Sequence, residues 1–336
     1  MASLLVTPDN INNIDLSNIF TLELHHKLSS ENIEKLFSTD LNNITTLICS
    51  DCPSILYIPD LPNLVSLDCK NCINLTAIPV LDKLEVLDIS DCRRIRSLPI
   101  LYNLTTLVCQ GSGLRKIPYL INLLTLDVSN CYTLEKLPIL SGLVTLICHN
   151  CVNLRELYSQ SLIDIVLSYA GKAYTFHSLT TLDCTGCVSL TRLPPLPKLN
   201  TLICNNCISL RSIPMLSQLV ILECSKCTRL KLLPSLPKLS RLDCSMCDFK
   251  TLPSFTNLCV LKCVGCSKLE TLPSLGNLSI LDCKFCNELK YIPELPKLTL
   301  LDTRQCNRIG KPPIKITPIF NTLSDIKLLS QPLDRI

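Results

Sequence analysis

Apolar residues recur along most of the chain with a period of about twenty residues. In the copy from Leu179 to Leu199, they occupy positions 1, 4, 6, 9, 12, 15 and 18, and prolines occupy positions 16 and 19. A fixed period of this length predicts a stacked solenoid rather than a domain built around one central core. The thirteen copies have their first positions at Ile44, Leu64, Leu84, Leu104, Leu123, Leu143, Leu179, Leu199, Leu219, Leu239, Leu258, Leu278 and Leu298.

Each repeat divides into a strand half and a return half. Positions 3 to 7 predict a short parallel strand in which positions 4 and 6 point inward and positions 3, 5 and 7 point outward, because side chains alternate along an extended chain. The return half reads LPxLP. Its prolines remove backbone donors and force extended geometry, which predicts polyproline-like segments or short turns instead of helices.

The unit resembles the leucine-rich repeat, whose core is LxxLxLxxN/CxL, in a short form of the type LxxLxCxxCxxLxxLPxLP. Position 6 departs from the usual leucine and is mostly cysteine, and position 9 takes the cysteine option. The resemblance covers roughly residues 44–316. It implies an α/β solenoid of right-handed coil, with a parallel sheet on the concave face and protein binding through that face.

Both ends of the series depart from the unit. Residues 1–43 predict an N-terminal capping region with a degenerate repeat, in which Ser30 is the N-cap of a short helix and Ile33, Leu36 and Phe37 share one face. Residues 317–336 predict a C-terminal cap that starts with a helix N-cap at Thr317. A solenoid needs such caps because its terminal layers would otherwise expose their apolar side chains.

The repeat that starts at Leu143 contains an insertion at about residues 158–178. The LPxLP tail is missing there, and the inserted sequence carries an apolar run from Leu162 to Leu167. Insertions in solenoids loop out on one face, which is often the binding face. A neutral insertion packed on the convex side is the alternative.

Composition and charge narrow the function classes. The net charge of +4 and the isoelectric point near 8.1 do not favour nucleic-acid binding, which usually requires a strongly basic surface. The N-terminal residues lack a secretory signal, and no stretch is long enough to span a bilayer. We therefore expect a soluble, intracellular monomer that contacts neither nucleic acid nor membrane.

The cysteines offer two interpretations. Twenty-three are present, and pairs with C-x2-C spacing could bind metal or undergo redox chemistry. Cysteine also behaves as a small buried hydrophobe, and one packing rule accounts for both columns, so we expect reduced thiols, no metal and no cofactor. Ten cysteines occupy position 6 (Cys49, Cys69, Cys109, Cys148, Cys184, Cys204, Cys224, Cys244, Cys263, Cys283) and twelve occupy position 9 (Cys52, Cys72, Cys92, Cys131, Cys151, Cys187, Cys207, Cys227, Cys247, Cys266, Cys286, Cys306).

Position 5 is expected to face solvent on the concave side, and acidic residues dominate it. This acidic stripe could receive a basic segment of a partner protein. A solvated face inherited through duplication of one ancestral repeat is the alternative, and the sequence leaves both open. The acidic residues are Asp68, Asp88, Asp127, Asp183, Glu223, Asp243, Asp282 and Asp302.

Motifs of known catalytic sites are absent from the sequence. It contains no HExxH, GxGxxG or GxxxxGK[ST], so we expect no enzyme activity. The LPxLP tail is similar to that of bacterial effectors, which carry ubiquitin-ligase activity in a separate domain that has no counterpart here. A substrate-recognition subunit of a ubiquitin ligase remains an alternative. The asparagine-, isoleucine- and lysine-rich flanks also resemble leucine-rich repeat proteins of giant DNA viruses, which would place the protein in host cytoplasm.

Overall fold

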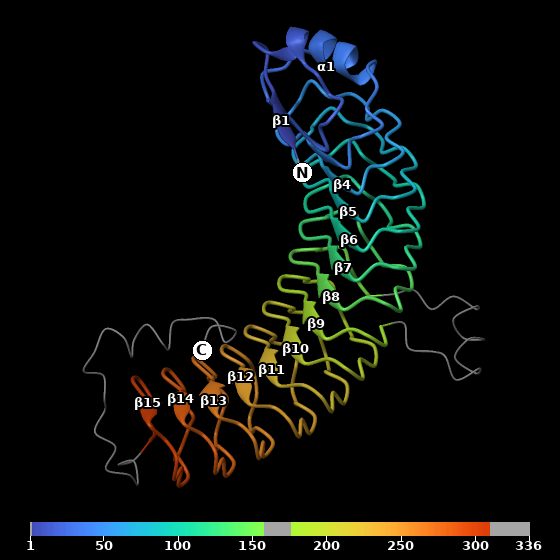
Figure 1. The fold of residues 1–336 in the computed structure, drawn as a ribbon. Coiled ribbons are helices and arrows are strands. Elements are labelled where there is room, and N and C mark those ends of the chain that lie inside the picture. The colour runs from blue at the N-terminus through green and yellow to red at the C-terminus, as the bar shows by residue number, and fades with distance from the viewer. Residues whose placement is uncertain (1, 158–175, 310–336) are drawn as a thin grey trace, which may run out of the picture. The chain divides into compact units, whose positions relative to one another are not determined.

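A computed structural model describes residues 2–157 and 176–309 (Figure 1). The chain forms two compact units. The first contains the described residues up to Cys151 together with Phe176, and the second contains residues 152–157 and the described residues from His177 onward. Both units are built from the same repeat, with one short strand for each copy.

The first unit contains eight strands that pair in parallel and follow one another in chain order. Its strands are β1 (Ser3–Val6), β2 (Thr21–Leu24), β3 (Thr46–Ile48), β4 (Ser66–Asp68), β5 (Val86–Asp88), β6 (Thr106–Val108), β7 (Thr125–Asp127) and β8 (Thr145–Ile147).

The second unit contains seven strands with the same parallel pairing. Its strands are β9 (Thr181–Asp183), β10 (Thr201–Ile203), β11 (Ile221–Glu223), β12 (Arg241–Asp243), β13 (Val260–Lys262), β14 (Ile280–Asp282) and β15 (Leu300–Asp302).

The strands of the thirteen repeats cover positions 3 to 5, which is shorter than the predicted positions 3 to 7. The reason is a turn at position 8, where the backbone has positive φ in every repeat. Ten residues there are not glycine and three are, which accounts for all thirteen copies. The amide of position 6 still pairs with the next strand, as Cys49 N does with Asp68 O at 2.7 Å.

The predicted inward columns form the core. Corresponding leucines at position 4 face one another in the register, for example Leu47 and Leu67, and each is only 1% exposed. The cysteines at position 6 and position 9 are likewise buried, except for the half-buried Cys306. The core is therefore a set of stacked aliphatic and thiol columns, as the period predicted.

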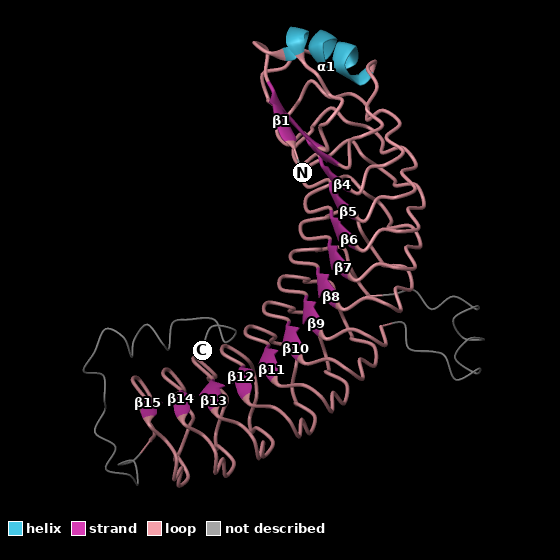
Figure 2. Cartoon of the chain, viewed as in Figure 1, coloured by secondary structure: helices cyan, strands magenta, loops and turns pink. Residues whose placement is uncertain are grey.

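The return segments are extended. From β3 onward, Figure 2 shows loop as the described connection between strands, and the described return segments of the thirteen repeats contain no helix. Their leucines and isoleucines still point inward, as Ile58 does with 5% exposure and Leu61 with 1%. In return segments such as this one, proline therefore sets an extended path that keeps two apolar side chains in the core.

The N-terminal region carries the predicted helix and one strand more than expected. Helix α1 (Ser30–Phe37) buries Ile33, Leu36 and Phe37, which confirms the predicted face. The predicted cap is wrong by one residue, because Ser29 Oγ accepts the N–H of Asn32 at 3.2 Å and Ser30 is the first helical residue. The additional strand β1 pairs with β2, and a 3-10 turn η1 (Ile11–Asn13) lies between them.

Two predicted segments fall largely outside the described residues. Of the insertion at 158–178, the structure describes residues 176–178, where Phe176 is fully buried. The C-terminal cap predicted at 317–336 lies wholly outside them. Every repeat nevertheless has its strand within the described ranges.

Candidate functional site

The outward surface of the strands, which we call the strand face, consists of positions 3, 5 and 7 of each repeat. Parallel register places equal positions side by side on neighbouring strands. Asp68 lies opposite Asp88, Glu223 opposite Asp243, and Asp282 opposite Asp302. Six of the eight sequence-predicted acids therefore lie in adjacent pairs, whereas Asp127 lies opposite Val108 and Ile147, and Asp183 lies opposite Ile203.

The aspartates of position 5 have a structural role that neither interpretation of the sequence included. Asp68 Oδ1 accepts the N–H of Lys70 at 3.0 Å, and Asp88 Oδ1 accepts the N–H of Ser90 at 2.8 Å. An Asp side chain that bonds the amide two residues on stabilises a turn. The same bond ends the strand at Asp127, Asp183, Asp243 and Asp302.

Strands β3 to β8 of the first unit present a partly accessible strand face in which carboxylates and hydroxyls alternate with apolar residues such as Val108 and Ile147. Asp68, Asp88 and Asp127 are half-buried, and no described group donates a hydrogen bond to their Oδ2 atoms. Hydroxyl side chains at position 3 lie beside them and are also half-buried, namely Thr46, Ser66, Thr106, Thr125 and Thr145. This surface can both accept and donate hydrogen bonds.

The second unit corrects the prediction that position 5 faces solvent. Glu223 is 8% exposed, Asp282 2% and Asp302 0%. Lys262, the basic residue of this column, is 6% exposed and lies in register between Asp243 and Asp282. The acids at this end of the stripe are therefore buried groups, whereas Asp183 and Asp243 remain half-buried.

Basic side chains at position 7 neutralise the buried carboxylates. Lys284 Nζ lies 3.2 Å from Asp282 Oδ2 and 3.8 Å from Asp302 Oδ2. Arg304 forms a bidentate pair with Asp302, with Nε 3.0 Å from Oδ1 and Nη2 2.7 Å from Oδ2. Paired and hydrogen-bonded charges are the form in which carboxylates tolerate burial.

Burial and ion pairing shift the pKa values of these buried charged groups in different directions. Burial raises the pKa of Asp282, although Lys284 opposes the shift. Burial also acts to raise the pKa of Asp302, but the hydrogen bonds and charge of Arg304 outweigh it and the pKa is lowered. Burial lowers the pKa of Lys262 despite the nearby carboxylates of Asp243 and Glu223.

Apolar residues accompany the buried acids at position 3 of the last three strands. Val260 is 5% exposed, Ile280 9% and Leu300 7%, and Ile221 packs against this cluster. The change from threonine to aliphatic residues was visible in the sequence. Their burial on the strand face was not, because position 3 points away from the core.

The cysteines of position 9 form a hydrogen-bonded column that we call the cysteine ladder. In most repeats the thiol donates to the backbone carbonyl at position 6 of the preceding repeat, for example Cys72 Sγ to Cys49 O at 3.0 Å and Cys207 Sγ to Cys184 O at 3.1 Å. The contact recurs in both units. It confirms the packing interpretation of position 9.

The thiols of position 6 are poor nucleophiles. A hydrogen bond with the Cys72 thiol and burial together raise the pKa of Cys49 well above that of an ordinary thiol, and the same causes act on Cys69 through Cys92. Thiolate is the reactive form of cysteine, so these groups should react slowly. Within the described ranges, no three His, Cys, Asp or Glu side chains are arranged to hold a metal ion.

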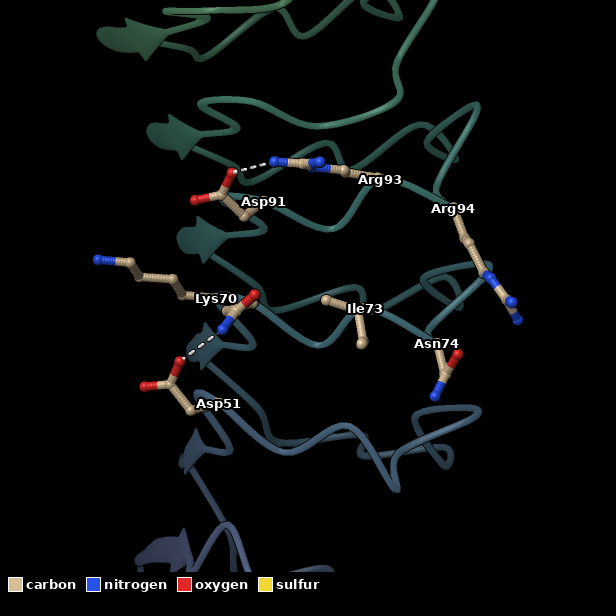
Figure 3. A pocket seen from close by; sticks show the side chains of 8 residues that line it. Asp51, Lys70, Ile73, Asn74, Asp91, Arg93 and Arg94 are labelled. Carbon is tan, nitrogen blue, oxygen red and sulfur yellow. Dashed lines mark hydrogen bonds and ion pairs between the residues drawn. The ribbon is translucent and has the colours of Figure 1, made fainter.

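The turn column at position 8 borders a surface hollow of about 590 Å³ in the first unit (Figure 3). Asn71 Nδ2 donates to Asp51 Oδ1 at 2.8 Å, and Arg93 approaches Asp91 at 4.0 Å. Carboxylates and basic side chains both line the hollow, so its charge favours no single class of ligand. The sequence contained a signal for this turn that was missed: many repeats have Asn, Asp or Gly at position 8, between the two cysteine positions.

These observations define the architecture. It is a leucine-rich repeat solenoid. The parallel register, the inward columns and the turn at position 8 establish this fold. Among the described residues, no helix is long and apolar enough to cross a membrane.

Among solved structures, the chain is similar to several others, one of which can be described. It is a leucine-rich repeat protein of Leptospira interrogans, with 17% identity and a TM-score of 0.30 over 83% of this chain and 95% of that chain. No family model matches the chain, and no curated protein does.

Proposed function

We propose that the protein is a non-enzymatic scaffold that binds a partner protein through the strand face of β3 to β8. Leucine-rich repeat solenoids typically present extended surfaces for protein binding. The observation that carries the proposal is the set of half-buried carboxylates in this column, the adjacent pair Asp68 and Asp88 and, beyond Val108, Asp127, with hydroxyl side chains beside them. The corresponding acids of β14 and β15 are buried and ion-paired.

The chemistry of these carboxylates favours a segment that donates hydrogen bonds and carries positive charge. Each of the three carboxylates uses Oδ1 for its own turn. Oδ2 can then accept from an arginine or lysine of the partner, and such charge-assisted bonds are stronger than neutral ones. Facing carboxylates such as Asp68 and Asp88 repel each other, and a basic partner would relieve that repulsion.

The test must remove charge without removing the turn. Asparagine keeps the Oδ1 acceptor, so the triple variant Asp68→Asn, Asp88→Asn and Asp127→Asn should fold normally. Peptides selected from a random phage-displayed library on the wild-type chain serve as probes. We expect enrichment of Lys and Arg and about a tenfold weaker Kd for the triple variant, equivalent to about 1.4 kcal/mol.

A matched control changes the same charge elsewhere. Asp60→Asn, Asp82→Asn and Glu135→Gln remove three exposed carboxylates outside the strand face of the same unit. Peptide affinity should stay within twofold of wild type in this control, a difference of about 0.4 kcal/mol. Equal loss in both triple variants would show general charge attraction, and equal retention in both would place the binding site elsewhere.

A further inference from the structure

Positions 10 to 19 of each repeat, which we call the return path, lead from the turn at position 8 back to the next strand on the side of the repeat opposite the strands (Figure 2). In the repeats of β5 and β6, the return path carries basic residues at positions 10 to 14 and no acidic residue there. All of these basic residues are exposed, namely Arg93, Arg94, Arg96, Arg115 and Lys116.

Most of these cations lack a carboxylate partner. Arg93 approaches Asp91 at 4.0 Å, and Figure 3 shows that Arg94 points away from that carboxylate. Among the described residues, no acidic side chain forms an ion pair with Arg94, Arg96, Arg115 or Lys116. The positive charge of this surface is therefore not neutralised by the chain itself.

An equivalent pair in the second unit shows what is missing. Lys290 N donates to Glu270 O at 3.1 Å, and the two side chains form an ion pair at 2.8 Å. Arg115 N donates to Arg96 O at 3.4 Å in the same way, so these two arginines occupy the corresponding places. Arginine thus replaces the internal counter-ion, and two like charges lie on adjacent repeats.

Large apolar side chains lie further along the same return paths. Tyr102 is 63% exposed and Tyr119 is 53% exposed, although Leu101 and Leu120 between the exposed positions are each 1% exposed. Positions 17 and 19 of the repeats of β9 to β14 are instead proline, serine, threonine or glycine, except for a methionine and a glutamate. The exposed apolar residues at positions 17 and 19 near β5 and β6 are Val80, Ile100, Tyr102, Tyr119 and Ile121.

The charged and the apolar residues form one surface, which we call the return-path patch. Position 17 lies about 12 Å from position 13 along an extended chain. Duplication of one ancestral repeat would give every copy the same residues. In the repeats of β5 and β6, two separate sets of columns depart from the other copies together, and an apolar patch bordered by charge is typical of an interaction site.

We propose that the return-path patch binds a polypeptide segment of a partner protein that carries both acidic and apolar side chains. Carboxylates of the partner supply the counter-ions that Arg94, Arg96 and Arg115 lack. Its apolar side chains cover Tyr102 and Tyr119. This site is separate from the strand face of β3 to β8 and takes a partner of opposite charge.

The composition of the patch favours a protein over a membrane surface. Four of the five cations are arginine, whose planar guanidinium binds carboxylates with two parallel hydrogen bonds. Tyrosine and arginine are also the side chains that contribute most to protein interfaces. Elsewhere on the return paths the chain already pairs cations with carboxylates, as Lys268 does with Asp248 at 2.6 Å.

Peptide selection on the full wild-type chain tests the proposal. From a random phage-displayed library we expect a class of peptides enriched in Asp and Glu together with aromatic or aliphatic residues. Arg94→Gln with Arg96→Gln and Arg115→Gln should weaken the Kd of these peptides about tenfold. Tyr102→Ser with Tyr119→Ser should weaken it by about the same factor without any change of charge.

Two control variants separate this site from general charge attraction and from the strand face. Arg211→Gln with Arg229→Gln and Lys250→Gln removes three exposed cations from the same repeat positions in the second unit. Asp68→Asn with Asp88→Asn and Asp127→Asn changes the strand face alone. Both controls should keep the Kd of the acidic peptides within about twofold of wild type.

A single substitution tests the counter-ion argument while preserving the fold. Arg96→Glu places a carboxylate where Glu270 lies in the second unit, so it should pair with Arg115. The melting temperature should equal or exceed that of wild type, and the acidic peptides should bind more weakly than they bind Arg96→Gln. Equal binding by Arg96→Glu and wild type would overturn the proposal.

The remaining outcomes identify other occupants. A library that yields no acidic, apolar peptides would overturn the proposal, as would equal weakening in the arginine variant and its second-unit control. Sedimentation of wild type, but not of the arginine variant, with vesicles of phosphatidylserine and phosphatidylcholine would assign the patch to a membrane. Self-association of wild type that the arginine variant loses would assign it to a second copy, and either result would refute a separate protein partner.

Discussion

The cysteine ladder allows a stability prediction at Cys207. Its thiol is 0% exposed and lies 3.1 Å from Cys184 O. Cys207→Ala removes one heavy atom from a close-packed core, which costs about 1 to 1.5 kcal/mol. It also removes a weak S–H donor whose net contribution is about 0.5 to 1 kcal/mol.

The carbonyl that loses its thiol partner is not left unsatisfied. Cys184 O also accepts the N–H of Cys187 at 3.1 Å. The cost of an orphaned buried acceptor therefore does not apply, and the total should be about 2 kcal/mol. Cys207→Ser should cost less, because a hydroxyl retains a donor. The chain already contains serine in this column at Ser112, which lies 3.6 Å from Cys131 Sγ.

Urea unfolding followed by circular dichroism measures the free energy change, and hydrogen exchange locates it. Each turn of a solenoid contacts only its neighbours, so exchange should rise in β9 to β11 and stay unchanged in β3 to β5. Cys259→Ala is the matched control, because Cys259 is exposed and lies outside both columns. That variant should differ from wild type by less than about 0.5 kcal/mol.

Two outcomes would refute this reasoning. If Cys207→Ala were as stable as Cys259→Ala, the ladder would contribute neither packing nor a hydrogen bond. If Cys207→Ser were as unstable as Cys207→Ala, the loss would come from packing alone.

Three further predictions concern single residues. Asp127→Ala should lower the unfolding free energy by about 1 kcal/mol because Ser129 N–H loses its acceptor, whereas Asp127→Asn should stay within about 0.5 kcal/mol in urea unfolding. Phe285 has φ 63° and is 51% exposed, so Phe285→Gly should relieve strain and raise the melting temperature, with a gain of up to about 1 kcal/mol. Burial raises the pKa of Cys52 to about 12 from an ordinary 9.0. Below pH 9 the Cys52 thiol keeps its proton in both the folded and the unfolded chain. Between pH 9 and 12 the unfolded chain loses this proton while the folded chain keeps it, so the free energy of unfolding should fall by up to about 1.4 kcal/mol per pH unit. Unfolding measured between pH 8 and 11 should show a shallower fall in Cys52→Ser.

The period predicted the fold because every layer repeats the same local contacts. Positions 4, 6 and 9 are inward in each copy, so one unit determined the core of all thirteen. The end of the strand at position 5 was not predicted. It depends on the turn at position 8, where residues as different as Asn71 and Phe285 adopt the same positive φ.

The N-terminal region shows a second limit of the sequence pattern. The apolar face of α1 was clear, but Ser29 and Ser30 are both good capping residues and local sequence could not separate them. Strand β1 was missed because it lies before the repeats and has few alternating positions from which to infer a strand.

The column of position 5 shows why a shared pattern could not assign function. Its aspartates close the same turn throughout, and this local role accounts for their recurrence without a partner. Residues that depart from the shared repeat pattern distinguish the two units. Thr106 and Thr125 beside Asp127 leave a polar face partly open in the first, whereas Val260 and Ile280 accompany buried ion pairs in the second.

A binding surface should therefore be sought where a column departs from its consensus. Lys262 interrupts an acidic row and lies between Asp243 and Asp282 in the register. A basic residue there reduces repulsion among carboxylates that burial would otherwise make costly. A lysine in place of an acid is therefore of little use where the strand face is open and favourable where the strand face is buried. The replacement of acid by lysine, together with threonine by valine, thus marks the point along the repeats where the strand face changes from partly accessible to buried.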